Sequence, residues 1–155
     1  MKKSDKILAG IVIGIVLLVG VAFAVALTRP KPDYREEDTP EGVAHNYLLA
    51  LQQEDYERAY GYLSTSMSDY PLSLRIFTDD IENYSDADVN STTQVDTPAT
   101  IKGDRATVKV QHTRFYQGGL FSSRSYSSTF DMTLVKEEGK WRIIASDRYW
   151  SWRWR

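Results

Sequence analysis

The stretch TPEGVAHNYLLALQQEDYERAYGYLS, residues 39–64, decides the fold of the longest part of this chain. Thr39 is a suitable N-cap, Pro40 suits the first helical position, and Glu41 places an acid in the first turn. Asp55 can cap a second helix in the same way. Apolar residues recur at helical spacing along both segments: Val43, Tyr47, Leu48, Leu51, Tyr56, Ala59, Tyr60 and Leu63. The stretch therefore predicts two amphipathic helices in succession.

The rest of the chain after this stretch changes its period from helical to alternating. A third helix is predicted from Pro71, and from about residue 92 the apolar residues alternate with polar ones. Turns are expected at residues 102–104, 117–119 and 137–140. We therefore expect an α+β fold, with about three helices packed on a curved, mainly antiparallel sheet of about four strands.

The N-terminal segment predicts a transmembrane helix ahead of this domain. Residues 7–27 contain no charged side chain, and a helix of that length spans roughly 31 Å, close to the thickness of a bilayer core. Lys2, Lys3 and Lys6 precede it and favour a cytoplasmic N-terminus. The predicted organisation is a cytoplasmic N-terminus (1–6), a transmembrane helix (7–27), a linker (28–38) and an extracytoplasmic domain (39–155).

The same segment could alternatively be interpreted as a cleaved signal peptide. Ala22-Phe23-Ala24 offers the small residues of a cleavage site, although the apolar run continues beyond it. The uninterrupted run favours a retained anchor, so the expected location is the cell membrane, as a single-pass protein with its C-terminal domain outside the cytoplasm.

Two parts of the domain carry a resemblance to a known family. Residues 40–64 contain a "small-Asp-aromatic" step and then Ala-Tyr and Leu-Ser, and residues 133–144 end in a Gly-Lys-Trp hairpin. This pattern resembles the nuclear transport factor 2-like superfamily, the cone-shaped fold shared with ketosteroid isomerase. The resemblance implies a small, membrane-anchored bacterial member of that superfamily, and its motifs specify a fold rather than an activity. It rests on Ala50, Asp55, Tyr56, Ala59, Tyr60, Leu63, Ser64, Gly139, Lys140 and Trp141.

Composition excludes several classes of function. Residues 34–155 carry 14 basic and 19 acidic side chains, which argues against nucleic acid as a partner. The chain has no cysteine and two histidines, so neither a disulfide framework nor a metal site is expected. No phosphate-binding or dinucleotide-binding motif is present, and no cofactor is predicted.

Candidate catalytic residues are few. His112 shares its strand parity with Val108 and Val110, so it could point inward, and Tyr126 and Asp131 lie on the next strand. The resemblance implies a base with a tyrosine or carboxyl donor inside the cone, which these three residues could supply. Tyr126 and Asp131 differ in parity and cannot both face one cavity without a bulge. A hydrogen-bonded structural role for His112 is the alternative.

The C-terminal segment YWSWRWR, residues 149–155, is the other candidate site. In an extended conformation Trp150, Trp152 and Trp154 share one face, while Arg153 lies on the other. Three interpretations remain open: continuation of the last strand into the core, a partner or self-association surface, and contact with the membrane interface.

The expected function is that of a non-catalytic binding or scaffold module at the cell envelope. Its partner would be an envelope protein or a small apolar or aromatic ligand, and a homodimer could form through the open sheet. The alternatives are an isomerase-like or hydratase-like enzyme and a component of a secretion or cell-wall assembly.

Overall fold

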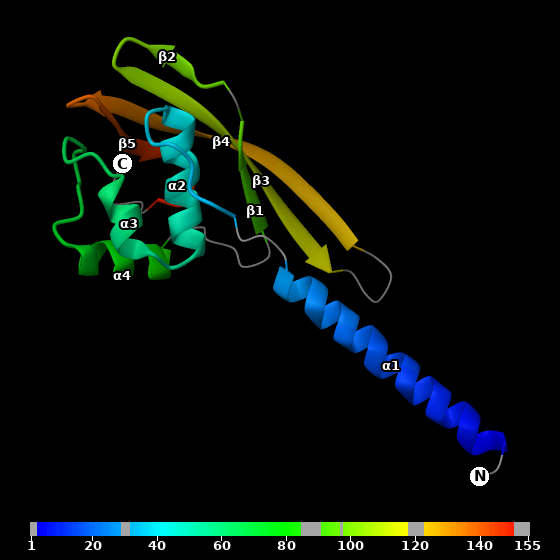
Figure 1. Ribbon diagram of the computed structural model, residues 1–155. Coiled ribbons are helices and arrows are strands. Elements are labelled where there is room, and N and C mark those ends of the chain that lie inside the picture. Colours follow the sequence, from blue (N-terminus) through cyan, green and yellow to red (C-terminus); the bar gives the residue numbers. More distant parts are fainter. Residues whose placement is uncertain (1–2, 29–31, 85–90, 97, 118–122, 151–155) are drawn as a thin grey trace. The chain divides into compact units, whose positions relative to one another are not determined.

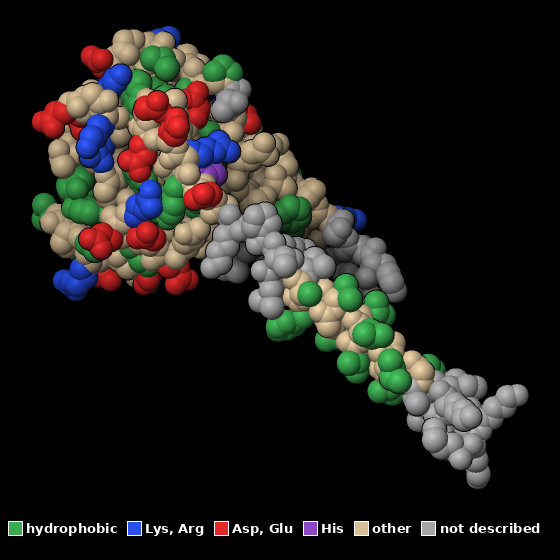
Figure 2. All heavy atoms as spheres, in the orientation of Figure 1, with side chains coloured by type: hydrophobic (Ala, Val, Ile, Leu, Met, Phe, Trp, Pro, Cys, Tyr) green, Lys and Arg blue, Asp and Glu red, His purple; other side chains and the backbone are tan. Residues whose placement is uncertain are grey.

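The computed structural model describes residues 3–28, 32–84, 91–96, 98–117 and 123–150. The chain divides into two compact units, Met1–Asp33 and Tyr34–Arg155. In its described residues the first unit contains one helix, α1 (Lys3–Thr28). The side chains described within α1 run from Gly10 to Ala24, and most of the hydrophobic ones are exposed (Figure 2).

The transmembrane prediction is corrected by the structure. Among the residues described, no helix combines the length and the apolarity that a membrane span requires. The predicted transmembrane helix at 7–27, and with it the expected single-pass anchor, is therefore wrong on this finding.

The second unit begins with three helices. α2 (Pro40–Gln52) starts after Thr39, whose hydroxyl accepts the Gly42 N–H at 3.1 Å. α3 (Tyr56–Gly61) starts after Asp55, which accepts the Arg58 N–H at 3.2 Å. α4 (Leu74–Tyr84) follows a loop of twelve residues. Side-chain caps thus set where α2 and α3 begin.

The strands of the described residues form one antiparallel sheet of five strands. The sheet has the order β1-β3-β4-β5, and β2 pairs with β3 beyond the end of β1. The strands are β1 (Ser91–Val95), β2 (Thr100–Lys102), β3 (Arg105–Gln117), β4 (Ser123–Glu137) and β5 (Lys140–Ser146). The expected fold class is therefore corrected at its N-terminus, where a transmembrane helix was predicted, and the sheet has one strand more than expected.

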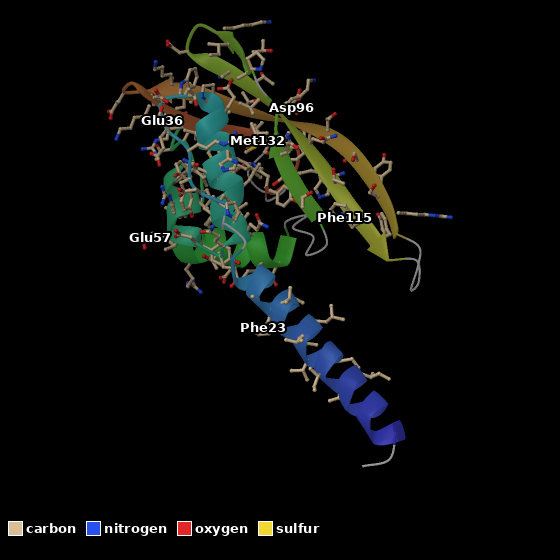
Figure 3. The ribbon with its side chains drawn as sticks, turned by 45° about the vertical axis from the view of Figure 1, so that its right-hand side comes forward. Phe23, Glu36, Glu57, Asp96, Phe115 and Met132 are labelled. Carbon is tan, nitrogen blue, oxygen red and sulfur yellow. The ribbon has the colours of Figure 1, made fainter. Side chains whose placement is uncertain are left out.

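The core lies between the sheet and the helices, which cover one face of the sheet (Figure 1). Val108, Met132 and Ile143 are fully buried there, and Met132 points toward the helices in Figure 3. On the opposite face Lys109 and Asp131 lie side by side and form an ion pair of 3.7 Å. The alternation along β3 and β4 thus separates a buried face from a polar one.

The segment ahead of α2 belongs to the second unit. The Asn46 side-chain amide accepts the Arg35 N–H at 2.7 Å and donates to the Arg35 carbonyl at 2.8 Å. The Arg58 guanidinium lies over the Tyr34 ring, 3.4 Å from its centre. Residues 34–38, which the sequence assigned to a linker, are thereby held against α2 and α3.

The segment after β5 returns to the core rather than extending the strand. The strand ends at Ser146, and the backbone reaches a positive φ of 56° at Tyr149. The Tyr149 carbonyl accepts the Tyr47 hydroxyl at 2.8 Å, and Trp150 is buried with its ring 6.2 Å from that of Tyr47. Residues 149 and 150 therefore complete the core beneath α2.

Candidate functional site

A pocket of about 490 Å³ lies between the end of α3 and the turn that joins β4 to β5. We call it the tyrosine pocket. One wall comes from α3 and the loop after it, and the other from the end of β4, the turn and the start of β5. It is lined by Tyr60, Gly61, Leu63, Thr65, Tyr70, Glu137, Glu138, Lys140 and Arg142.

Backbone pairing holds the two walls together. The chain after α3 runs beside β5 as a short parallel bridge between Leu63 and Ile143. The Ile143 N–H donates to the Tyr62 carbonyl at 2.9 Å, and the Ser64 N–H donates to the Ile143 carbonyl at 2.8 Å. The loop is thus fixed to the edge of the sheet, and the position of one wall determines that of the other.

A cluster of two serines and a glutamate joins the walls at the base of the loop. The Ser64 hydroxyl donates to Glu137 Oε1 at 2.7 Å, and the Ser66 hydroxyl donates to the same oxygen at 2.8 Å. Ser64 is fully buried, so its hydrogen bond is formed away from water. Among the described residues none bonds the second oxygen, Oε2, which leaves it able to accept a hydrogen bond from a ligand.

Aromatic rings form the apolar part of the pocket. The Tyr60 and Tyr70 rings lie 5.3 Å apart between centres, and Phe77 backs Tyr60 at 5.5 Å. The Tyr60 hydroxyl donates to the Pro71 carbonyl at 2.7 Å, which fixes the ring. Burial, together with a hydrogen bond to Tyr60, raises the pKa of Tyr70 above its ordinary value, so this hydroxyl stays neutral at physiological pH.

Charged side chains of both signs form the polar part. Glu138 sits in the turn between β4 and β5 at a φ of 50°, and Gly139 follows at 82°. The Arg142 guanidinium donates to the Gly61 carbonyl across the pocket. Glu138 and Lys140 are exposed, and within the described part of the chain neither side chain is paired. The pocket therefore offers a carboxylate and an ammonium group close to a tyrosine wall.

The residues expected to form a catalytic site are not brought together. His112 is buried, with its ring centre 5.8 Å from that of Tyr149 in an edge-to-face arrangement, whereas Asp131 is half exposed on the opposite face and paired with Lys109. Tyr126 lies on the face of His112 but is 65% exposed, near the end of the β3–β4 hairpin. His112 and Asp131 thus cannot act on the same substrate atom in this arrangement.

Only part of the candidate site at the C-terminus lies within the described residues. Trp150 is buried against Tyr47, as a core residue. Trp152, Arg153 and Trp154 lie outside the described residues. In the parts of the chain that are described, no group of three potential metal ligands is found.

The tyrosine pocket was missed by sequence reasoning, because its walls are about 70 residues apart in the chain. Residues 137–140 were interpreted only as a turn. One signal was available, namely that the turn carries two acids beside Lys140 and Arg142, an unusual density of charge of both signs. This charge pattern does not show that the turn packs against α3 and the loop after it.

Comparison with known proteins was made at the levels of sequence and structure. No protein family matches this sequence, and no curated protein matches it. The fold resembles the solution structure of a SEC-C motif containing protein from Rhodopseudomonas palustris, with a TM-score of 0.51 and 18% identity over 74% of this chain and 81% of that one. A function unknown protein from Mycobacterium tuberculosis gives a TM-score of 0.47 at 16% identity, over 68% of this chain and 66% of that one.

These comparisons correct the family resemblance. The Rhodopseudomonas palustris structure, with a TM-score of 0.51, is described as that of a SEC-C motif containing protein and not as nuclear transport factor 2-like. The predicted membership of that superfamily, as a membrane-anchored member, is therefore wrong on these findings. At 18% identity the likeness to the Rhodopseudomonas palustris protein concerns the fold alone.

Proposed function

We propose that this protein is a binding module for a small zwitterionic ligand that carries a flat apolar group, and that the tyrosine pocket is its site. One observation carries the proposal: an unpaired carboxylate on Glu138 and an unpaired ammonium on Lys140 flank a wall of two tyrosine rings within one pocket. Amino acids and the ends of short peptides have this combination of charges.

The charges of the pocket lining support a zwitterion over a simple anion or cation. Glu137 and Glu138 are balanced by Lys140 and Arg142, so the lining has no net charge. A ligand with one charge would meet attraction and repulsion of similar size, whereas a ligand with both charges can place each beside its opposite. Tyr60 and Tyr70 would cover its apolar group.

The construction of the pocket supports binding rather than catalysis. Glu137 is held by two serine hydroxyls, and Arg142 is held by the Gly61 carbonyl, so both are positioned before any ligand enters. Groups fixed in this way lose little conformational freedom on binding. The residues expected to catalyse an isomerase-like reaction, His112 and Asp131, lie on opposite faces of the sheet.

The proposal is tested with four ligands that share one ring and differ in charge. Ligand-observed NMR would compare L-tyrosine (zwitterion), tyramine (cation), 4-hydroxyphenylacetate (anion) and 4-ethylphenol (neutral) with the full chain. We expect L-tyrosine to bind most tightly, because it alone can use both Glu138 and Lys140. Equal affinity for all four, or no binding of any, would contradict the proposal.

Charge-removing variants then locate the site. Lys140→Gln should weaken binding of L-tyrosine and the anion about two- to five-fold, as exposed ion pairs are worth about 0.5–1 kcal/mol. It should strengthen binding of the cation, because the repulsion from Lys140 is removed. Glu138→Gln should weaken binding of L-tyrosine and the cation and strengthen binding of the anion. Lys109→Gln, on the polar face of the sheet, is the control and should change none of the affinities.

A further inference from the structure

The outer edge of β4 is open over its first half. β3 pairs with β4 from Ser123 to Val135, whereas β5 pairs with β4 only from Met132 onward. Asp131 is bonded through its backbone to Asp147. Among the described residues no strand pairs with the remaining edge, Ser123–Phe130, so its outward N–H and C=O groups can accept another strand.

This open edge lacks the features that usually prevent pairing. It contains no proline and no lysine, and its one charged residue is Arg124. The pairing with β3 continues without a register shift along the whole segment, so no bulge turns the edge away. The segment is also long, and its seven residues from Arg124 to Phe130 extend about 24 Å.

We propose that this edge pairs antiparallel with the same edge of a second copy of the chain, which joins the two sheets into one. A strand pairs with its own copy across a two-fold axis when its polarity is similar on either side of a central residue. The segment meets this condition around Ser127, because Ser125 and Thr129 flank it on the outer face. Tyr126 and Ser128 flank it on the helix-covered face.

Geometry selects the register. In a two-fold antiparallel pair, directly opposed residues come from the same face of the sheet, so the axis must pass through a residue and not between two. Pairing that uses the open edge from Arg124 to Phe130 places this axis at Ser127. Ser125 then lies opposite Thr129 of the partner subunit, and such hydroxyl pairs across strands are favourable.

The same register also accommodates the two large exposed side chains of the segment, Tyr126 and Arg124. Tyr126, which is 65% exposed in one copy, lies diagonally across the axis from Tyr126 of the partner subunit, within reach for ring contact. Arg124 lies opposite Phe130 of the partner subunit, so the two arginines are about 20 Å apart and repel each other little. Seven paired residues form a small interface, so the dimer is expected to be reversible.

The first test is the mass of the full chain in solution, measured by sedimentation equilibrium in a non-ionic detergent that covers the apolar surface of α1. We expect a concentration-dependent dimer. Ser127→Lys places two like charges at the axis and should weaken dimerisation at least ten-fold. Ser68→Lys, an exposed turn residue with the same change of charge, should leave it unchanged. Ser127→Ala shows the effect of losing the hydroxyl bonded to Thr113 and should still dimerise.

The second test uses the absence of cysteine from the chain. Two Ser127→Cys side chains would face each other across the axis with their Cβ atoms about 5 Å apart, within reach of a short bismaleimide crosslinker. Crosslinking should give a covalent dimer, and Ser68→Cys should not. A monomeric wild type, a dimer that Ser127→Lys leaves intact, or the absence of the Ser127→Cys dimer would each overturn the proposal. A dimer formed through α1, or a different protein bound at this edge, would appear as one of these outcomes.

Discussion

At the scale of single residues, one buried hydroxyl links the first helix of the second unit to the end of the described chain. Tyr47 is fully buried and donates to the Tyr149 carbonyl at 2.8 Å. Tyr149 also contacts His112 and Phe130 through its ring. A single hydrogen bond from α2 thus fixes the backbone of the residue that covers the buried histidine.

Replacing Tyr47 by Phe should reduce the free energy of unfolding by about 1–2 kcal/mol, because the Tyr149 carbonyl loses its hydroxyl donor in a buried place. Burial also raises the pKa of Tyr47 above its ordinary value of 10.0. Above about pH 10 the unfolded chain releases this proton and the folded one does not, so stability should fall as pH rises.

Urea unfolding at about pH 7 and about pH 11 measures both effects. Stability of the wild type should drop more between these values than that of the Tyr47→Phe variant, since the variant lacks this ionisation. An equal loss of stability in the wild type and the variant would show that the pKa of Tyr47 is the same in the folded and unfolded chain. Tyr126→Phe, which is exposed, is the matched control.

At the scale of elements, the turn between β4 and β5 holds Glu138 in an unfavourable backbone conformation. The same residue supplies a negative charge to the tyrosine pocket. Glu138 adopts a φ of 50°, a region that asparagine and glycine tolerate better than glutamate. The turn would be more stable with Asn-Gly in place of Glu138-Gly139. A strained residue retained beside a pocket is consistent with a functional role for its side chain.

Glu138→Asn should therefore stabilise the fold by about 0.5 kcal/mol and weaken binding of L-tyrosine and tyramine. Glu138→Gln is the matched variant, because it removes the charge and keeps a long side chain at the same φ. It should weaken binding without any gain in stability. Thermal unfolding and NMR titration of both variants distinguish these effects, and a gain in stability for both variants would contradict the assigned strain.

Features that depend on residues close together in the chain, such as helix caps and strand alternation, could be predicted from the sequence. Thr39 and Asp55 cap their helices because capping is local, and alternation placed His112 on the buried face of β3. The tyrosine pocket could not be predicted, because Tyr60 and Lys140 meet only through the Leu63–Ile143 bridge. No periodicity encodes such a bridge. The transmembrane helix and the family resemblance were both inferred from the sequence and both had to be corrected.

At the scale of the whole molecule, the two units differ in how they are stabilised. Among the described residues, the buried hydrophobic cluster runs from Val43 to Trp150 and lies in the second unit. Tyr34 packs against this cluster, and Asn46 binds the backbone of Arg35. The second unit therefore has its own core, and its first residues are structural.

Two truncations test this boundary. A chain of residues 34–155 should unfold at the same urea concentration as the full chain, because it keeps the whole core. A chain of residues 39–155 should be less stable by about 1–3 kcal/mol, because the buried Asn46 amide loses both bonds to Arg35. Equal stability of the two truncated chains would show that residues 34–38 contribute nothing to the fold.

The bond between Tyr47 and Tyr149 also has a consequence for synthesis of the protein. Its two residues are 102 positions apart, and at about 5–20 residues per second a ribosome needs roughly 5–20 s to pass from one to the other. During that interval α2 has no completed sheet to cover its apolar side, since β3, β4 and β5 are made later. The nascent chain is therefore expected to rely on chaperones until Trp150 has left the ribosome, whereas a refolding chain has every strand available from the start.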